Sequence, residues 1–221
     1  MDEQTIMKFH KSDTDEQISK LEIASDKMIS FSEIYKSYCL GIVDIVSSTK
    51  ITAGLGKSKM GTYYSLFLNS MALIVKECGG AVVKNIGDSL LYYFPKTSDT
   101  LNRPAFADSL ECGMKMIDAH SILNIKMREE GLPNVNYRIS SDHGMITMAT
   151  SINSLGEDIF GPTVNVCAKI NSLAMPNTMA IGGDLYQIVK SFEGYRFGSI
   201  SEYHNGLKIH YPVYSIRRNI V

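Results

Sequence analysis

The chain of 221 residues lacks several patterns that are typical of common functional classes. It has no cluster of lysine or arginine that could follow a nucleic-acid backbone or a membrane surface, and its formal net charge is −1. We therefore expect no nucleic-acid partner. No apolar run approaches the roughly 18 residues of a membrane span, and the acidic, polar start differs from an export signal. Together these absences predict a cytoplasmic protein without a membrane span.

Cysteine is scarce, and its spacing gives neither a disulfide framework nor a metal centre. The sequence has four cysteines, no Cys-x-x-Cys pair and no metal-ligand spacing between cysteine and histidine. Each cysteine lies among apolar residues, which indicates reduced thiols in the core of a cytosolic protein. The four are Cys39, Cys78, Cys112 and Cys167.

The sequence also lacks internal repeats, low-complexity segments and the Gly-x-Gly-x-x-Gly turn of dinucleotide-binding folds. Its length and its 44% hydrophobic content predict one well-cored domain with a short appendage. Predicted strands and helices alternate, but without the regular parallel β-α repeat. This order favours a layered α/β sandwich of the α+β kind.

Periodicity gives the expected elements. Residues 1–13 are polar, and an imperfect apolar stripe that ends near Ile34 predicts an N-terminal helix from residue 14. This helix could dimerise or transmit a signal, or it could pack on its own domain. We accordingly divide the chain into a tail with an amphipathic helix, residues 1–36, and a catalytic domain, residues 37–221. Further helices are expected over 57–78 and 105–130, with a strand pair on either side of a turn at 142–144.

Two apolar runs end at carboxylates. Ala81 to Val83 and Leu90 to Phe94 read as a hairpin whose tip carries Lys84 and Asp88. These two could form an ordinary charge pair on a solvated turn.

The second run, Tyr38 to Val46, contains Asp44, and Thr49 follows it at a predicted helix start, where backbone N–H groups favour anions. If the two strands are neighbours, Asp44 and Asp88 converge as hard oxygen ligands that suit Mg²⁺ or Mn²⁺.

Three segments in order resemble the catalytic domain of class III adenylate and guanylate cyclases. They are Asp44-Ile-Val-Ser-Ser-Thr49, Lys84-Asn-Ile-Gly-Asp88 and Asp158-Ile-Phe-Gly-Pro-Thr-Val-Asn165-Val-Cys-Ala-Lys169. The resemblance covers roughly residues 38–216, and it rests on the three segments together because each alone is weak. It implies a ferredoxin-like βααββαβ core and a head-to-tail homodimer with nucleotide sites in the interface.

The resemblance also implies roles for the residues of the metal and phosphate site. Asp44 and Asp88 match the metal-binding aspartates, and the Ile45 carbonyl matches a further ligand, for two Mg²⁺ or Mn²⁺ ions per site. Four other residues match the phosphate-binding positions. Arg138 and Lys208 could instead be surface charges, and the match of Lys208 is the weaker of the two. Ser47-Ser48 stands where the family often has Gly-Phe. The four are Ser48, Thr49, Arg138 and Lys208.

Base choice in this family is read by positions that match Lys84 and Asp158. A lysine donor and an aspartate acceptor resemble the adenine-selecting pair, whereas guanine-selecting members typically carry glutamate and cysteine. The resemblance therefore implies adenylate cyclase activity, the conversion of ATP to 3′,5′-cyclic AMP and pyrophosphate. Asp158 could instead cap the helix that follows it.

One helix carries the remaining catalytic positions and the main departure from the family. Asn165 matches the ribose-orienting asparagine, and Lys169, one helical turn later, stands where the family usually has a transition-state arginine. Lysine keeps the charge but loses the planar fork of donors. Lys169 therefore leaves open a weak or inactive nucleotide-binding dimer. A cyclase for GTP or a pyrimidine nucleotide also stays open, because neighbouring residues can remodel a base pocket.

Overall fold

The computed structural model describes residues 17–19, 29–151, 157–200, 203–204, 207–208 and 211–219. Its strands are β1 (Ile29–Ile45), β2 (Ala81–Ile86), β3 (Ser89–Phe94), β4 (Tyr137–Ser151), β5 (Glu157–Phe160), β6 (Met179–Gly182), β7 (Tyr195–Ile200), β8 (Tyr203–His204), β9 (Leu207–Lys208) and β10 (Val213–Arg218). Its helices are α2 (Ser48–Thr52), α3 (Lys57–Glu77), the 3₁₀ turn η1 (Pro95–Ser98), α4 (Arg103–Asp118), α5 (His120–Glu129), α6 (Pro162–Leu173) and α7 (Gly183–Val189). None of the helices in these ranges is long and apolar enough to cross a bilayer.

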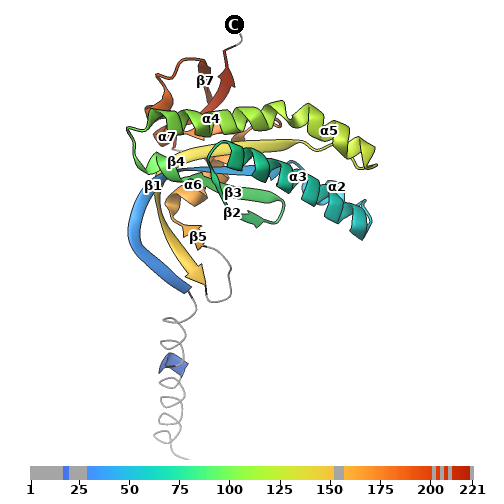
Figure 1. Ribbon diagram of the computed structural model, residues 1–221, viewed down its shortest axis with the longest axis horizontal. Helices are drawn as coiled ribbons and strands as arrows, with labels where there is room; N and C mark the ends of the chain where they lie inside the picture. Colours follow the sequence, from blue (N-terminus) through green and yellow to red (C-terminus); the bar gives the residue numbers. More distant parts are fainter. Residues whose placement is uncertain are drawn as a thin grey trace, which may run out of the picture.

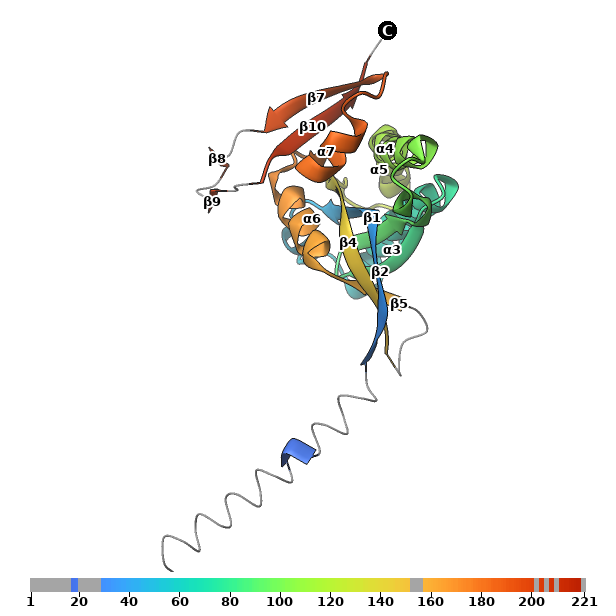
Figure 2. The same ribbon diagram turned by 90° about the vertical axis from the view of Figure 1, so that its left-hand side faces the viewer.

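The core of the protein is an eight-stranded sheet in the order β2-β3-β1-β4-β6-β10-β7, with β5 paired to β4. Helices α3, α4 and α5 cover one face and α6 covers the other, as Figure 2 shows; Figure 1 gives the view at right angles to it. Alternate residues of β1 pack into the two layers: Cys39 and Val43 join the core beneath α3 and α4, whereas Leu40 and Ile42 join the core beneath α6. The predicted mixed α/β sandwich is confirmed.

Strand β1 is longer than the sequence pattern predicts. It begins at Ile29 and pairs with β4 from Ile29 opposite Ser151 to Ile45 opposite Tyr137. The prediction of helix over residues 29–36 was therefore wrong, because pairing with a strand about a hundred residues away outweighs a weak helical stripe. Residues 17–19 are helical. The rest of the predicted N-terminal helix lies outside the described residues.

Strand β4 is also continuous, so the predicted turn at residues 142–144 was wrong. The strand runs between β1 and β6, and its central polar residues Ser140, Ser141 and Asp142 are buried. The hydroxyl of Ser141 donates a hydrogen bond to the Leu40 carbonyl at 2.6 Å. Polar side chains can lie inside a sheet when neighbouring strands supply hydrogen-bond partners. The sequence alone does not show these partners, so the polar residues resemble a turn.

The predicted helix over 105–130 is two helices, α4 and α5, which meet at Ala119. At the start of α5 the ring of His120 lies 3.1 Å from the Val135 carbonyl, and the Asn124 amide bonds the same carbonyl at 3.0 Å. These contacts fix α5 against the segment that leads into β4. Helix α3 agrees with its predicted bounds and ends before Gly79, whose positive φ of 75° only glycine adopts readily.

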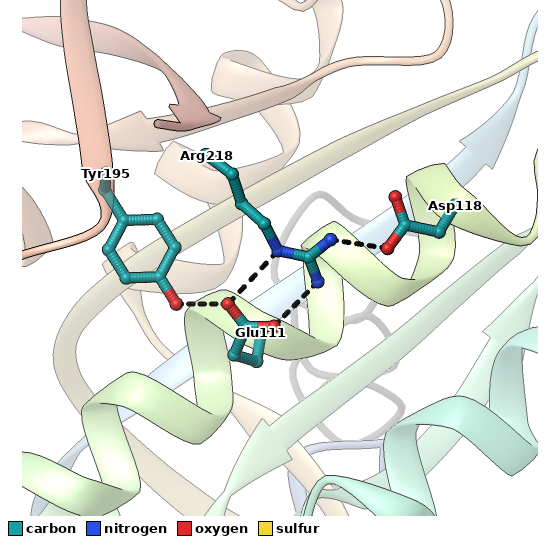
Figure 3. Close-up of polar contacts among 4 residues, drawn as sticks. All are labelled: Glu111, Asp118, Tyr195 and Arg218. Carbon is teal, nitrogen blue, oxygen red and sulfur yellow. Dashed lines mark hydrogen bonds and ion pairs between the residues drawn. The ribbon is translucent and has the colours of Figure 1, made fainter. Parts of the chain in front are cut away.

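A polar cluster ties α4 to the two strands at the far edge of the sheet (Figure 3). Arg218 of β10 donates to both Glu111 and Asp118 of α4, with 2.7 Å from Nη2 to Glu111 Oε2. The hydroxyl of Tyr195 in β7 donates to the other oxygen of Glu111. The Arg218 guanidinium is the main cause of the lowered pKa of Glu111. These contacts hold α4 against β7 and β10.

We expect Arg218→Ala to lower the free energy of unfolding by about 1 kcal/mol, since a partly exposed network of charge-assisted bonds is worth little more than that. Urea denaturation at pH 7.5 measures the change. The matched control is Lys126→Ala, which removes two exposed ion pairs, to Glu129 and Glu130, and should lower the free energy of unfolding less than Arg218→Ala does. If the two variants lost the same free energy of unfolding, the Arg218 cluster would stabilise the fold no more than an ordinary surface ion pair does.

Candidate active site

The two aspartates of the predicted metal site lie at the same end of neighbouring strands. Asp44 stands opposite Ser89 where β1 pairs with β3, and Asp88 lies with Gly87 in the two-residue turn between β2 and β3. The Ser89 hydroxyl donates a hydrogen bond to Asp44 Oδ1. The predicted hairpin and the predicted convergence of Asp44 and Asp88 are thus confirmed.

The surroundings of Asp44 disfavour an uncompensated negative charge. Burial is the main cause of its raised pKa, and the charge of Asp88 adds to it, whereas the Ser89 hydrogen bond and the Arg138 charge act against it. A cation between the two carboxylates would offset burial and repulsion together, so the residues present fit a divalent metal ion with oxygen ligands.

A cation at this site would need further oxygens. Asp44 and Asp88 are only two side-chain ligands. Nowhere in the described ranges do three or more histidine, cysteine, aspartate or glutamate side chains lie close enough together to hold a metal ion. The side chain of Ile45 is buried in the core, so this residue could contribute only its backbone carbonyl. The remaining ligands would come from water and from a bound molecule such as a triphosphate.

A pocket of about 260 Å³ opens beside Asp44, between the sheet and α6. Arg138 of β4 stands opposite Asp44 in the strand register, and both residues line the pocket. The Nε atom of Arg138 is buried and has no hydrogen-bond partner among the described residues. A guanidinium nitrogen without a partner, on a residue that lines a pocket, is suited to a phosphate oxygen.

The predicted phosphate turn follows directly after β1. Ser47 has a left-handed backbone conformation with φ 59°, and α2 begins at Ser48. Ser48 is buried and Thr49 is exposed. Glycine adopts this conformation at no steric cost, which gives a physical reason for its frequent use in this position in proteins that resemble this chain.

Lys84 and Asp158 are brought together by β2 and β5, and their side chains form an ion pair. The Lys84 side chain is 43% exposed and that of Asp158 is 29% exposed, so both can still be reached by a ligand. Lys84 therefore pairs with Asp158 and not with Asp88. The alternative that Asp158 caps a helix was wrong, because Asp158 belongs to β5 and Gly161 occupies the N-cap of α6.

Asn165 and Lys169 lie on α6 and are exposed. Ala168 and Ser172 of the same helix line the pocket beside Asp44, whereas Asn165 and Lys169 are not among its lining residues. The pocket beside Asp44 therefore does not include these two predicted catalytic residues. Lys208 lies in β9, and its side chain is outside the described part of the structure.

Comparison with known proteins agrees with this geometry. The model of the family described as "Adenylate and Guanylate cyclase catalytic domain" matches residues 31–211. The chain belongs to this family. An adenylate cyclase of Glutamicibacter nicotianae is 28% identical over 140 residues, which are 63% of this chain and 29% of that protein. An adenylate cyclase of Streptomyces coelicolor is 23% identical over 142 residues, 64% of this chain and 31% of that protein. The cyclase domain thus spans less than a third of either relative.

Solved structures share the fold. The adenylyl cyclase CyaB from P. aeruginosa has a TM-score of 0.74 and 18% identity, with 85% of this chain and 96% of that chain covered. The guanylyl cyclase Cya2 has a TM-score of 0.70 and 17% identity, with 83% and 92% covered. Because the two neighbours bear different substrate names, the fold alone does not select the base.

Two residues that position the site of the cyclase domain were not found from the sequence. Ser89 bonds Asp44, and Asn171 joins α6 to the sheet through hydrogen bonds from its amide to the Ile42 carbonyl at 3.2 Å and the Arg138 carbonyl at 3.3 Å. The available signal for Asn171 was its spacing, since it lies four residues after Cys167 on the buried face of α6. A polar residue on an apolar face implies such partners.

Asp142 and His143, which had no assigned role, belong to the framework of the cyclase domain. Asp142 accepts hydrogen bonds from the Tyr211 hydroxyl at 2.9 Å and from the Leu185 backbone N–H at 3.2 Å, so it joins β4 to α7 and to the segment before β10. Burial raises the pKa of Asp142 to about 6. His143 packs edge-on against Phe106, and burial lowers its pKa, as in a neutral core histidine.

The buried Asp142 predicts a pH effect on stability. A carboxyl whose pKa rises from 3.8 to about 6 on folding stabilises the folded state when protonated, and this contribution is lost as the pH rises through 6. Between pH 7.5 and pH 5 the wild type should gain about 1 kcal/mol of unfolding free energy relative to Asp142→Asn.

Denaturation of both proteins at the two pH values measures this difference. Tyr211→Phe is the control, because it removes a hydrogen bond to Asp142 but keeps the buried carboxyl, and it should retain the pH dependence. If the unfolding free energy of the wild type changed between the two pH values by the same amount as that of Asp142→Asn, the carboxyl would not titrate in this range.

Proposed function

We propose that this cyclase domain converts ATP to 3′,5′-cyclic AMP and pyrophosphate at sites in a homodimer interface. The observation that carries the choice of ATP is the Lys84–Asp158 ion pair. These residues come from strands far apart in sequence, and each matches one member of the adenine-selecting pair of the family. The two most similar sequences described above also bear the name adenylate cyclase.

The base is selected by hydrogen-bonding complementarity. Lys84 offers N–H donors and Asp158 offers carboxylate acceptors, which suit the N1 acceptor and the exocyclic amino donor of adenine. A guanine in the same orientation presents a donor at N1 and an acceptor at position 6, so both protein groups would face like partners. Buried polar groups left without partners cost about 1–3 kcal/mol each.

The remaining residues hold the triphosphate and the ribose. Asp44, Asp88 and the Ile45 carbonyl would hold two Mg²⁺ or Mn²⁺ ions, which neutralise triphosphate charge and favour ionisation of the ribose 3′-hydroxyl. Arg138, Ser48, Thr49 and Lys208 are the proposed phosphate contacts.

Arg138 has the clearest geometric support among these contacts, because it lines the pocket beside Asp44 and its Nε has no hydrogen-bond partner among the described residues. The other three rest on their match to the family.

A homodimer would bring together proposed catalytic residues that do not line one pocket within a single chain. Asp44 and Asp88 of one protomer are proposed to act with Lys84, Asp158, Asn165 and Lys169 of its partner. Asn165 would orient the ribose, and Lys169 would stabilise the charge that develops at the α-phosphate. A symmetric homodimer then holds two equivalent sites, since each chain carries both half-sets. The proposal includes an intracellular location, where ATP is available.

Two alternatives rest on specific observations. GTP is the competing substrate, because several neighbours with the same fold are guanylyl cyclases, one of them solved in complex with GTP. A nucleotide-binding dimer without turnover is the other alternative, because Lys169 stands where the family usually has arginine. Product identity separates the first alternative from the proposal, and binding without product identifies the second.

The test is to incubate the purified protein with Mn²⁺ and separately with ATP, GTP, CTP and UTP, and to identify products by mass spectrometry. The proposal predicts cyclic AMP as the dominant product. Cyclic GMP or a cyclic pyrimidine nucleotide as the main product would show that the preferred substrate is GTP or a pyrimidine nucleotide and not ATP. Dimerisation and ATP binding without any cyclic product would support the regulatory alternative.

Lys169 sets an expectation for the rate. Lys169→Arg should raise the turnover number by about tenfold, because a guanidinium can contact two oxygens of the α-phosphate at once and a better charge-assisted contact is worth roughly 1.4 kcal/mol. The exposed Lys96→Arg is the matched control and should leave the rate unchanged. A Lys169→Arg variant no faster than the wild type would indicate that Lys169 does not reach the reacting phosphate.

A further inference from the structure

Three residues form one row across the sheet at the proposed metal site. Asp44 of β1 stands opposite Ser89 of β3 on one side and opposite Arg138 of β4 on the other. Directly opposite residues of antiparallel strands share a face, so the three side chains lie on the same face of the sheet. All three residues line the pocket beside Asp44. The Asp44 carboxylate therefore has a polar neighbour on each side within its own chain.

The two oxygens of the Asp44 carboxylate differ in their contacts. Oδ1 accepts a hydrogen bond from the Ser89 hydroxyl. Oδ2 has no hydrogen-bond partner in the part of the chain that the structure describes. An ionised carboxylate can only accept, and each oxygen has lone pairs for a hydrogen bond or a cation. The hydrogen bond thus leaves Oδ2 as the oxygen of Asp44 that is free to bind a metal ion.

The backbone of this row is held in place by α6. The Asn171 amide donates to the Ile42 carbonyl at 3.2 Å and to the Arg138 carbonyl at 3.3 Å, and it also lies 3.3 Å from the Ser140 hydroxyl. The same hydroxyl lies 3.4 Å from the sulfur of Cys167, one of four cysteines that are free and buried, as the sequence predicts. These contacts tie the helix to β1 and β4 beside the pocket, so the strands there have little freedom to adjust to a larger ion.

Divalent ions differ in what they need from a carboxylate. Ca²⁺ takes about six to eight oxygen ligands in a flexible arrangement and often binds both oxygens of one carboxylate. Mg²⁺ is smaller, requires a nearly ideal octahedron and binds through one or two carboxylates together with water and phosphate oxygens. Mn²⁺ likewise suits an octahedron of oxygens. A carboxylate with one oxygen already engaged by a hydroxyl is therefore better matched to Mg²⁺ or Mn²⁺ than to Ca²⁺.

We propose that Ser89 determines the metal specificity of this site and selects Mg²⁺ or Mn²⁺ over Ca²⁺ by engaging Oδ1 of Asp44. The inference rests on the proposed function, because the metal site belongs to that reaction. Ser89 is a positioning residue, since it acts through Asp44 and needs no contact with the ion. In Ser89→Ala both oxygens of Asp44 are free, so Ca²⁺ gains a ligand, whereas Mn²⁺ loses the group that holds its ligand in place.

The test measures metal binding rather than turnover. Binding of Mn²⁺ to the full-length protein is followed by electron paramagnetic resonance, and Ca²⁺ is then added until Mn²⁺ is displaced. Each titration is made without nucleotide and with α,β-methylene-ATP, in which carbon replaces the oxygen that would leave the α-phosphorus. In Ser89→Ala we expect the ratio of the Ca²⁺ to the Mn²⁺ association constant to rise at least about tenfold. Ser89→Thr keeps the hydroxyl and should keep the ratio of the wild type.

Two further variants complete the design. Asp44→Ala gives the background of Mn²⁺ bound elsewhere. Ser215→Ala is the matched control, because this strand serine donates to the Gly198 carbonyl at 3.2 Å and lies outside the pocket, so its loss should change neither affinity.

A merely structural role of Ser89 would weaken the binding of Mn²⁺ and Ca²⁺ equally. An unchanged ratio of the two affinities in Ser89→Ala would therefore overturn the proposal, as would a wild type that binds no more Mn²⁺ than Asp44→Ala does. If Ser89 selected Mn²⁺ in this way but the protein formed no cyclic nucleotide, the proposed function would fail and this inference would stand.

Discussion

Asp44→Ala is expected to lower the rate of cyclic nucleotide formation by at least about a thousandfold, because loss of metal stabilisation of the transition state costs several kcal/mol. The fold should survive this change. Asp44 is a half-buried carboxyl whose pKa is raised by burial, so its removal takes away an unfavourable charge as well as a proposed metal ligand. Initial rates with Mn²⁺ and ATP measure the effect, and the melting temperature reports the fold.

Glu129→Ala, which removes an exposed carboxylate on α5, is the control and should keep full activity. The shared site adds a sharper comparison. Asp44→Ala and Asn165→Ala proteins, each inactive alone, should form heterodimers with one intact site. An equal mixture should recover about a quarter of the wild-type rate, because half of the dimers are mixed and each has one site of two. No recovery after demonstrated subunit exchange would contradict a site shared between protomers.

The double variant Lys84→Glu with Asp158→Cys is expected to reverse the base preference from ATP to GTP. Two mismatched groups at about 1–3 kcal/mol each predict a change of at least about thirtyfold in the ratio of kcat/KM values. Lys84→Glu alone places two carboxylates side by side in the positions of the ion pair and should weaken both substrates. Full kinetics on ATP and GTP for the three proteins measure the change.

Lys76→Glu, an exposed change of the same charge on α3, is the control for this series and should leave the ratio unaltered. If the double variant retained the preference of the wild type for ATP, Lys84 and Asp158 would be a structural ion pair without contact to the base.

The parts of the fold that could be predicted are those with local signals. The hairpin of β2 and β3 follows from two apolar runs around a glycine turn, and α3 follows from its periodicity and its terminal glycines. Asp44 was visible as a carboxylate inside an apolar strand. These features depend on residues within one turn or one strand of each other.

The parts that could not be predicted depend on distant partners. Ser140, Ser141 and Asp142 read as a turn because they are polar, yet neighbouring strands satisfy them inside β4. Residues 29–36 follow a weak helical stripe, yet β4 provides the partner that makes them a strand. Without the position of the partner, a single sequence gives no means of choosing between these states.

The same distinction applies to the candidate site. The contact between Lys84 and Asp158 joins residues 74 positions apart, and no local pattern links them. Their pairing was expected only through the resemblance to class III cyclases. Ser89 and Asn171 escaped notice because each acts on a neighbour, the first on Asp44 and the second on the placement of α6.

The most direct test of the account is a competition between the two purine nucleotides at the unaltered site. The wild-type protein is given equal ATP and GTP with Mn²⁺ in one vessel, and both cyclic products are quantified at low conversion. The product ratio then equals the ratio of the two kcat/KM values. The account predicts cyclic AMP in excess by at least about tenfold, as one or more mismatched polar contacts require. Equal products, or cyclic GMP in excess, would contradict the assignment of Lys84 and Asp158 as an adenine-selecting pair.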